Sequence, residues 1–290
     1  MLPGINGRVV AVTAAVLLSF GAGRQAPVKV ARSTRHHSPI KKHEHKTDGT
    51  TSSINWSGYA VPSAAGSVTY VSGSWTVPTA TCGTAENDTA GYAAFWVGID
   101  GYSSNTVEQT GTDSDCVSTN GRKTDTPTYY AWFEFYPGGS YIIEFSKGVH
   151  PGDTMNATVT FNGLVSTRRR DRIGPGSSVT EPEFTITIED VTTGQSYSTS
   201  ALVGGAQESS AEWIAEAPCC ENNGDILPLA DFNPWAGFTA TSAMISGSAS
   251  SASSAEEITM IGEISPSTIK AEPSAATDGA FTVTWLNAGP

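Results

Sequence analysis

The sequence predicts an all-β protein, either a sandwich or a barrel, and three observations lead to this prediction. Residues from 54 onward are rich in Thr, Val, Ser, Gly and Tyr and show no convincing helical periodicity. Short runs of β-branched and aromatic residues recur there, with turn residues between them. This part of the chain is about 240 residues long, which suits a single domain of that class.

The first fifty or so residues differ from the rest in charge. Residues 1–53 contain eight Lys and Arg but only Glu44 and Asp48, a net charge of +6. The whole chain carries −12, so residues 54–290 carry −18. Four of the five histidines also lie before residue 54, and only His150 lies in the acidic body. Such asymmetry indicates an appended segment with a role of its own.

The extreme N-terminus has the pattern of a secretory signal peptide. Arg8 precedes the apolar run 9–20, and the small residues 21–23 follow it. The run is too short for a membrane span. We expect residues 1–23 to be a signal peptide, residues 24–53 a flexible basic propeptide, and the mature protein to be secreted to the extracellular space without a membrane anchor.

Strands are predicted along the body from the β-rich runs, in order. A hairpin signal at 192–195 (TTGQ) separates two of them. The runs are residues 68–77, 92–99, 128–136, 141–145, 154–161, 184–191, 197–203, 212–217, 237–245, 258–264 and 281–286.

Alternation assigns a side to each residue, because successive side chains of a strand point to opposite faces. In the run 128–136 one face is apolar, and the other places Glu134 among aromatic rings. Trp96 and Asp100 share one face of the neighbouring run. Such faces suit a groove for a polymer, peptide or sugar, and alternation alone is equally consistent with a half-solvated sheet covered by Trp rings.

Residue counts exclude several chemistries. Four cysteines, Cys82, Cys116, Cys219 and Cys220, fit disulfides in an exported protein. Cys82 and Cys116 could form one bridge, whereas the adjacent pair could bond to each other or elsewhere. No CxxC spacing and a single body histidine argue against zinc and against a Ser-His-Asp triad. The acidic body argues against nucleic acid, and no paired Asp-Thr/Ser-Gly segments are present for an aspartic peptidase.

Six short segments occur in an order and at spacings that resemble the glutamic peptidases, the eqolisins of peptidase family G1. The resemblance covers roughly residues 54–290. The segments are 55–58 (NWSG), 96–101 (WVGIDG), 109–111 (QTG), 131–137 (AWFEFYP), 151–153 (PGD) and 211–214 (AEWI).

The resemblance implies a concanavalin-A-like sandwich of two antiparallel sheets and an acid-active endopeptidase that cuts protein or peptide substrates. By motif, Gln109 and Glu212 would be the catalytic pair. No metal or cofactor is expected, and family precedent suggests a monomer. The groove residues would be Trp56, Asp100, Trp132, Glu134 and Tyr136. Two departures from the family pattern are Tyr130, where an acid is common, and Glu108, which by alternation should point away from Gln109.

This pair predicts a mechanism and a form of control. Ionised Glu212 would activate water, and the Gln109 amide, which cannot titrate, would stabilise the oxyanion at low pH. The basic segment could cover the acidic groove at neutral pH and release it in acid. The main alternative is a carbohydrate-active sandwich, either a lectin or a glycosidase with Glu134 and Glu212 as its paired carboxylates. A non-catalytic adhesion module is a third possibility.

Overall fold

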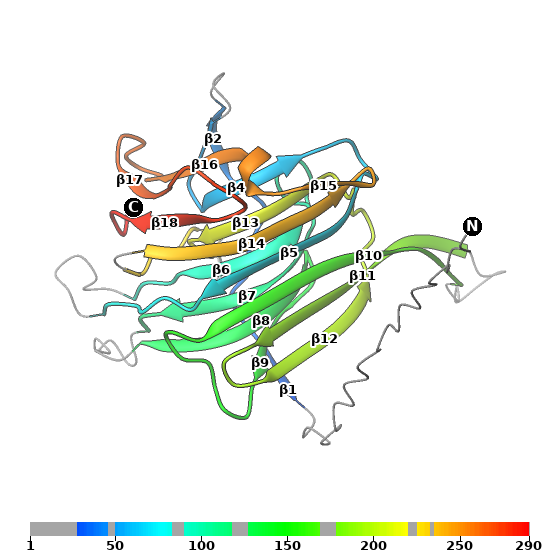
Figure 1. Ribbon diagram of the computed structural model, residues 1–290, viewed down its shortest axis with the longest axis horizontal. Coiled ribbons are helices and arrows are strands. Elements are labelled where there is room, and N and C mark those ends of the chain that lie inside the picture. Colours follow the sequence, from blue (N-terminus) through cyan, green and yellow to red (C-terminus); the bar gives the residue numbers. More distant parts are fainter. Residues whose placement is uncertain are drawn as a thin grey trace, which may run out of the picture.

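The computed structural model describes residues 28–45, 50–82, 90–117, 127–168, 178–219, 225–232 and 235–289. It is built almost entirely of β-strands, with one short 3-10 helix, η1 (Ala252–Ser254). The predicted signal peptide lies outside the described residues. Figure 1 shows two layers of strands, one in front of the other.

The front layer is an antiparallel sheet in the order β18-β14-β5-β10-β11-β12. Its longest pair, β10 with β11, extends beyond the neighbouring strands as a hairpin. The bounds are β18 (Phe281–Trp285), β14 (Trp235–Ile245), β5 (Val68–Thr76), β10 (Thr154–Arg168), β11 (Ser178–Asp190) and β12 (Gln195–Leu202).

The second layer has the order β1-β9-β8-β7-β6-β13-β4-β16-β3, antiparallel except for the pairing of β16 with β3. The bounds are β1 (Lys29–Arg32), β9 (Ser140–Glu144), β8 (Thr128–Tyr136), β7 (Val107–Asp115), β6 (Ala94–Ile99), β13 (Ser210–Glu216), β4 (Trp56–Pro62), β16 (Glu256–Ile261) and β3 (Thr50–Ser53). β2 (Lys42–His45) pairs with β3, β15 (Ser248–Ser250) pairs with β14, and β17 (Ile269–Pro273) bonds to both β16 and β18, which links the layers.

The main core lies between the two layers. Trp75 and Phe238 of the front sheet and Phe95 of the second sheet are fully buried there. A second, smaller apolar cluster lies on the other face of the second sheet and includes Trp96 and Trp132. The alternation of side chains along β6 and β8 therefore sorts one set into the sandwich core and the other onto an outward face, as the sequence predicts.

All eleven predicted runs are strands, so the all-β sandwich is confirmed. β4 and β7 were not predicted, and neither was any strand in the basic segment. The expectation that the segment is flexible is wrong for residues 28–45: β1 pairs along its whole length with β9, and β2 pairs with β3. Residues 50–53 belong to the second sheet, because β3 pairs with β16 and Thr51 and Ser53 are fully buried.

The disulfide between Cys82 and Cys116 is present, with its Cα atoms 5.5 Å apart. Cys219 is also disulfide-bonded, to a partner outside the described residues. The sequence therefore predicted one bridge correctly.

Candidate active site

Three neighbouring strands bring Gln109 and Glu212 together. Gly98 of β6 lies opposite Gln109 of β7 on one side and opposite Glu212 of β13 on the other. Residues directly opposite each other in a sheet point to the same face, so both side chains stand on the outward face of the second sheet. Their Cα atoms are two strand spacings apart, roughly 9–10 Å, and both side chains can reach over the strand between them.

Gly98 allows the Trp96 ring and the Gln109 side chain to pack closely against the strand that separates the pair. A Cβ atom at this position would lie 3.3 Å from the Cβ of Gln109 and 2.8 Å from the ring of Trp96. Any other residue would therefore clash with the Trp96 ring and crowd the Gln109 side chain. A glycine here therefore permits this close packing beside the amide and the carboxyl.

Glu212 is fully buried, and neither of its carboxyl oxygens has a hydrogen-bond partner among the described residues. Burial raises the pKa of Glu212 well above its usual value. A buried carboxyl without partners is costly unless it is neutral or hydrated. With the segment in place, Glu212 therefore favours the protonated state more than an exposed glutamate does.

More acidic groups share this face with the Gln109–Glu212 pair. Asp113 and Glu216 lie opposite each other across Ala94, and Glu134 lies opposite Gln109. The Trp96 ring N–H donates to a Glu216 oxygen at 2.8 Å, which fixes that carboxyl. Burial raises the pKa of Asp113, Glu134 and Glu216. These carboxyls therefore favour the protonated state more than exposed ones do.

The N-terminal segment of residues 33–41 crosses this face. The Gln109 side-chain amide donates to the backbone carbonyl oxygen of His37, with 2.5 Å between nitrogen and oxygen. His37 is almost completely buried, and its ring stacks on Trp132 with 3.5 Å between ring centroids. The Trp56 ring N–H donates to the carbonyl of Ser38 at 3.1 Å. A peptide backbone thus lies directly on the candidate catalytic amide.

Further polar contacts fix the segment on each side of His37. The backbone N–H of His37 donates to Glu134 at 2.8 Å, and the His36 ring is 2.6 Å from the other oxygen of the same carboxyl. Two backbone hydrogen bonds join His36 to Cys219. The Glu134 contact raises the pKa of His36, whereas burial lowers that of His37 well below its usual value.

Arg35 provides the strongest ionic contact of the segment. Its guanidinium lies 2.6 Å from an Asp115 oxygen and over the ring of Tyr92, 4.6 Å from the centroid. The Tyr130 hydroxyl lies within hydrogen-bond distance of both Asp113 and Asp115, at 2.7 and 2.9 Å. Burial outweighs these favourable contacts and raises the pKa of Asp115 to about 6.

The structure places four of the five predicted groove residues against the segment. Trp56, Trp132 and Glu134 make the contacts described above. The Tyr136 ring packs edge-on against the His36 ring, with 6.3 Å between the ring centroids. Asp100 has other partners. Its carboxylate accepts backbone N–H groups of residues 207, 208 and 209 at 2.7–2.9 Å, and it holds the loop that leads into β13.

The sequence did not single out Asp113, Asp115 or Glu216 as members of the site. Asp113 follows the QTG motif by two positions and Glu216 follows the AEWI motif by two, so strand alternation could have placed them beside the pair. Glu108 lies opposite Ile99, one position out of phase with Gln109, and therefore points to the sandwich interior as alternation predicts. Burial raises its pKa well above the usual value.

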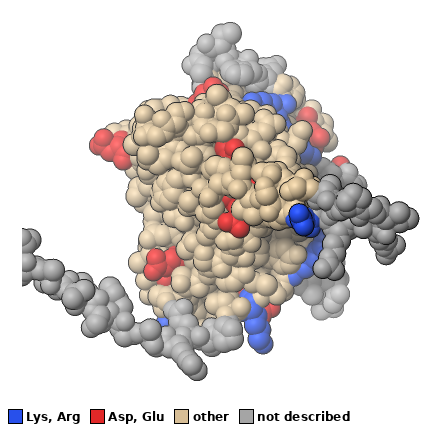
Figure 2. Space-filling view, turned by 90° about the vertical axis from the view of Figure 1, so that its right-hand side faces the viewer, with Lys and Arg blue, Asp and Glu red and all other residues tan. Residues whose placement is uncertain are grey.

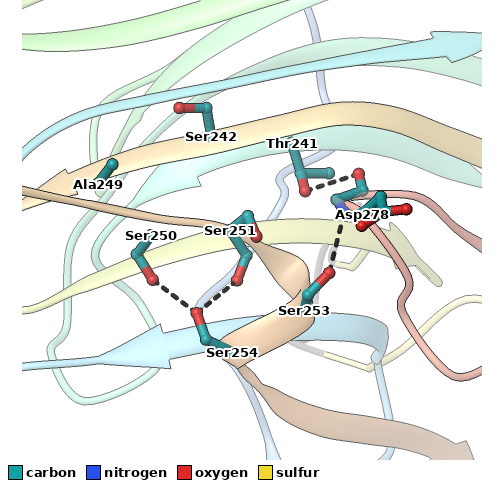
Figure 3. A pocket seen from close by; sticks show the side chains of 9 residues that line it. Thr241, Ser242, Ala249, Ser250, Ser251, Ser253, Ser254 and Asp278 are labelled. Carbon is teal, nitrogen blue, oxygen red and sulfur yellow. Dashed lines mark hydrogen bonds between the residues drawn. The ribbon is translucent and has the colours of Figure 1, made fainter.

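A separate cavity of about 480 Å³ opens between β14, η1 and the turn at Asp278. Figure 3 shows that Ser and Thr hydroxyls line it and bond to one another and to the Asp278 turn. Among the described residues that line it, Asp278 has the one carboxylate, and none has a histidine or amide side chain. This cavity has no pair of groups for acid–base work.

The groove on the second sheet is occupied by the chain's own N-terminal segment.

Across the described parts of the chain, no group of three or more His, Cys, Asp and Glu side chains has the arrangement of a metal site. In those same parts, no helix is long and apolar enough to cross a membrane.

The model of the peptidase A4 family matches residues 54–168 and 177–285, which include both members of the pair. The chain belongs to this family, the glutamic peptidases or eqolisins. It is therefore a glutamic-type peptidase, a hydrolase of peptide bonds. Membership decides against the carbohydrate-active alternative and against a non-catalytic adhesion module.

Solved eqolisin structures share the fold. Scytalido-glutamic peptidase with a transition-state analogue inhibitor matches with a TM-score of 0.61 and 26% identity, covering 80% of this chain and 98% of that one. SCP-B, an eqolisin in complex with the tripeptide Ala-Ile-His, matches with a TM-score of 0.58 and 24% identity over the same shares. A comparison with curated proteins found no match.

Proposed function

We propose that this peptidase is a secreted, acid-active endopeptidase in which Gln109 and Glu212 carry out the chemistry. The observation that supports the pair most strongly is the hydrogen bond from the Gln109 amide to a backbone carbonyl oxygen. That oxygen belongs to a peptide lying in the groove, in the place a substrate would take. The unpartnered Glu212 carboxyl stands on the other side of Gly98.

The chemistry follows from these positions. Water that enters the site hydrates Glu212 and opposes the rise in pKa that burial causes, so the ionised carboxylate becomes available in acid. Ionised Glu212 takes a proton from a water molecule, whose oxygen attacks the carbonyl carbon. The Gln109 amide stabilises the resulting oxyanion, and one such donor can contribute about 2.7–4 kcal/mol to the transition state. Glu212 then delivers its proton to the departing nitrogen. Gln109 has no ionisable group, so it remains a donor in acid.

The acidic groove supports activity at low pH. Burial raises the pKa of Asp113, Glu134 and Glu216, and that of Asp115 to about 6. As pH rises through these values, several close carboxylates become charged and repel one another and an anionic Glu212. Activity should be greatest in acid, where most of these groups are neutral, and lost by neutrality.

The N-terminal segment is a propeptide that keeps the enzyme latent. Its Arg35–Asp115 ion pair requires an ionised Asp115, and the pKa of that carboxyl is about 6. Below this pH Asp115 gains a proton and the ion pair weakens. Burial lowers the pKa of the His37 ring, so the docked segment holds this ring in its neutral form. A fall in pH that favours the protonated ring therefore also favours release of the segment.

The test is casein hydrolysis by the acid-treated protein across pH about 2–8, a range that brackets the ordinary Glu and His values. We expect hydrolysis in acid only, unaffected by pepstatin or a chelator and absent from a Glu212→Gln variant. A polysaccharide panel run beside it should show no hydrolysis. A maximum at neutral pH, or casein hydrolysis by the variant at the wild-type rate, would refute the proposal.

A further inference from the structure

The N-terminal segment contacts the catalytic groove through one peptide unit in particular, that between His37 and Ser38. Gln109, the proposed oxyanion donor, bonds to the carbonyl oxygen of His37 and to no other carbonyl of the segment among its described contacts. The residues on both sides of this unit are anchored by other groups. The bond is therefore presented to the pair in a fixed register.

Three anchors set that register. Upstream, the His36 backbone bonds twice to Cys219, and the His37 N–H bonds to Glu134. Downstream, the carbonyl of Ser38 accepts from Trp56. Sliding the chain by one residue would break all three and would move the buried His37 ring off Trp132.

We propose that His37–Ser38 is the bond at which the protein cuts itself to become active. This inference rests on the proposed function and extends it to a bond of this chain. Water adds to the His37 carbonyl carbon, and its proton passes to Glu212. The carbon–nitrogen bond then breaks, and the proton moves from Glu212 to the Ser38 nitrogen. The products are a carboxyl group on His37 and a new amino terminus on Ser38.

The two products differ in how the fold holds them. Residues 28–37 are attached to the body through the β1–β9 pairing and the side-chain contacts of Arg35, His36 and His37. Residues from 38 onward continue into β2 and β3, and β3 is built into the second sheet. Cleavage therefore leaves residues 28–37 held by these contacts alone, while β3 and the contacts of Ser38 with Trp56 and of Ile40 with Gly101 stay with the body.

The experiment incubates the full-length chain in acid at several pH values between about 3 and 6 and follows it by intact mass and N-terminal sequencing. Casein hydrolysis is measured on the same samples. The wild type should acquire Ser38 as its new N-terminus, and the Glu212→Gln variant should keep the bond intact.

Two further variants test the register. His37→Glu places an acidic side chain among Glu134, Glu216 and Asp113 and should slow the cut at this bond at least tenfold. His43→Glu, an equal change on exposed β2 outside the groove, should be processed like the wild type. Thermal unfolding of each variant verifies that it is folded.

The outcomes separate the two proposals. A different N-terminus on protein that hydrolyses casein overturns the assigned bond but leaves the peptidase pair standing. Equal cutting at His37–Ser38 in the Glu212→Gln variant assigns the cut to another protease and overturns self-processing. Absence of casein hydrolysis from every folded sample overturns the proposed function, and the inference falls with it.

Discussion

At the scale of single residues, Gly98 matters because of what it lacks. It separates Gln109 from Glu212 in the sheet and allows the Trp96 ring to pack closely over the strand. Strand alternation puts Gly98 on the same face as Trp96, but only the pairing of three strands shows that the two reactive residues flank it. Asp100 shows the opposite limit. Alternation places its side chain on the groove side, but its carboxylate accepts hydrogen bonds from three backbone N–H groups of another loop.

Replacing Gly98 by alanine should therefore damage the site more than the fold. The added methyl group would lie 2.8 Å from the Trp96 ring and 3.3 Å from the Cβ of Gln109. We expect kcat/KM to fall at least tenfold and the free energy of unfolding to fall by about 1–3 kcal/mol, as for other overpacked sites. Peptide hydrolysis and urea unfolding measure the two effects.

Gly139→Ala is the matched control for that substitution. Its added methyl group would meet only the ends of the Arg32 and Tyr141 side chains, at 3.3–3.5 Å. Its kcat/KM should stay within twofold of the wild type. A Gly98→Ala variant as active as this control would show that the close packing at Gly98 has no role in catalysis.

At the scale of elements, β7 is a strand that the sequence pattern does not predict. It carries Gln109, and all nine of its residues are buried. Its sequence, VEQTGTDSD, has polar residues on both faces, so it lacks the apolar alternation by which strands are recognised. A strand with catalytic groups on one face and a buried carboxyl on the other has the composition of a loop. Motif resemblance, and not periodicity, located it.

The N-terminal segment was hidden for a related reason. It has few apolar residues, and its order comes from specific polar and aromatic partners on the groove. The composition of such a segment shows that ordering it costs conformational entropy. It does not show the partner site whose contacts compensate for that cost. The charge asymmetry between the two parts of the chain was the one sequence signal that indicated contact between this segment and the body.

Arg35→Gln should loosen this segment at neutral pH. The substitution removes a charge-assisted hydrogen bond of about 1.5–3 kcal/mol, so amide hydrogen exchange in residues 33–38 should speed up roughly 10–100-fold near pH 7. The measurement is made in the Glu212→Gln background, which keeps the chain intact. The effect should shrink in acid, because Asp115, whose pKa is about 6, then loses its charge.

Arg32→Gln removes an equal charge from exposed β1 and is the control. Its exchange in residues 33–38 should match that of the parent. If Arg35→Gln had no more effect than Arg32→Gln, the ion pair with Asp115 would not be what holds the segment.

At the scale of the whole molecule, the formal charge of the body overstates its charge in the fold. On the face in Figure 2, acidic side chains are isolated among uncharged ones. Many others are inside the protein. The buried acidic residues of the described chain are Asp100, Glu108, Asp113, Asp115, Glu134, Asp153, Asp190, Glu208, Glu212, Glu216 and Asp231. Sequence gives the number of acids but not their burial.

Burial of these groups should make the protein most stable in acid. Folding raises the pKa of Glu108, Asp113, Glu212 and Glu216 above their usual values. The folded state therefore binds more protons than the unfolded state, and stability falls as pH rises. The contribution is complete below about pH 4, the unfolded range, and is lost as pH climbs through the raised values.

Each such group can contribute a slope of up to about 1.4 kcal/mol per pH unit across its window. Urea unfolding of the intact Glu212→Gln chain at pH about 4, 5.5 and 7 should show a steady decline in the free energy of unfolding. Greater stability at pH 7 than at pH 4 would contradict the assignment of neutral buried carboxyls.

The central claim is that Gln109 and Glu212 act together, and kcat of the acid-processed protein on a synthetic peptide tests it most directly. Gln109→Ala should lower kcat by about 10²–10³, and Glu212→Gln by at least about 10². Glu108→Gln changes an adjacent buried acid on the opposite face and should retain wild-type turnover. Wild-type kcat in the Gln109 or Glu212 variant, with both correctly folded, would contradict the account.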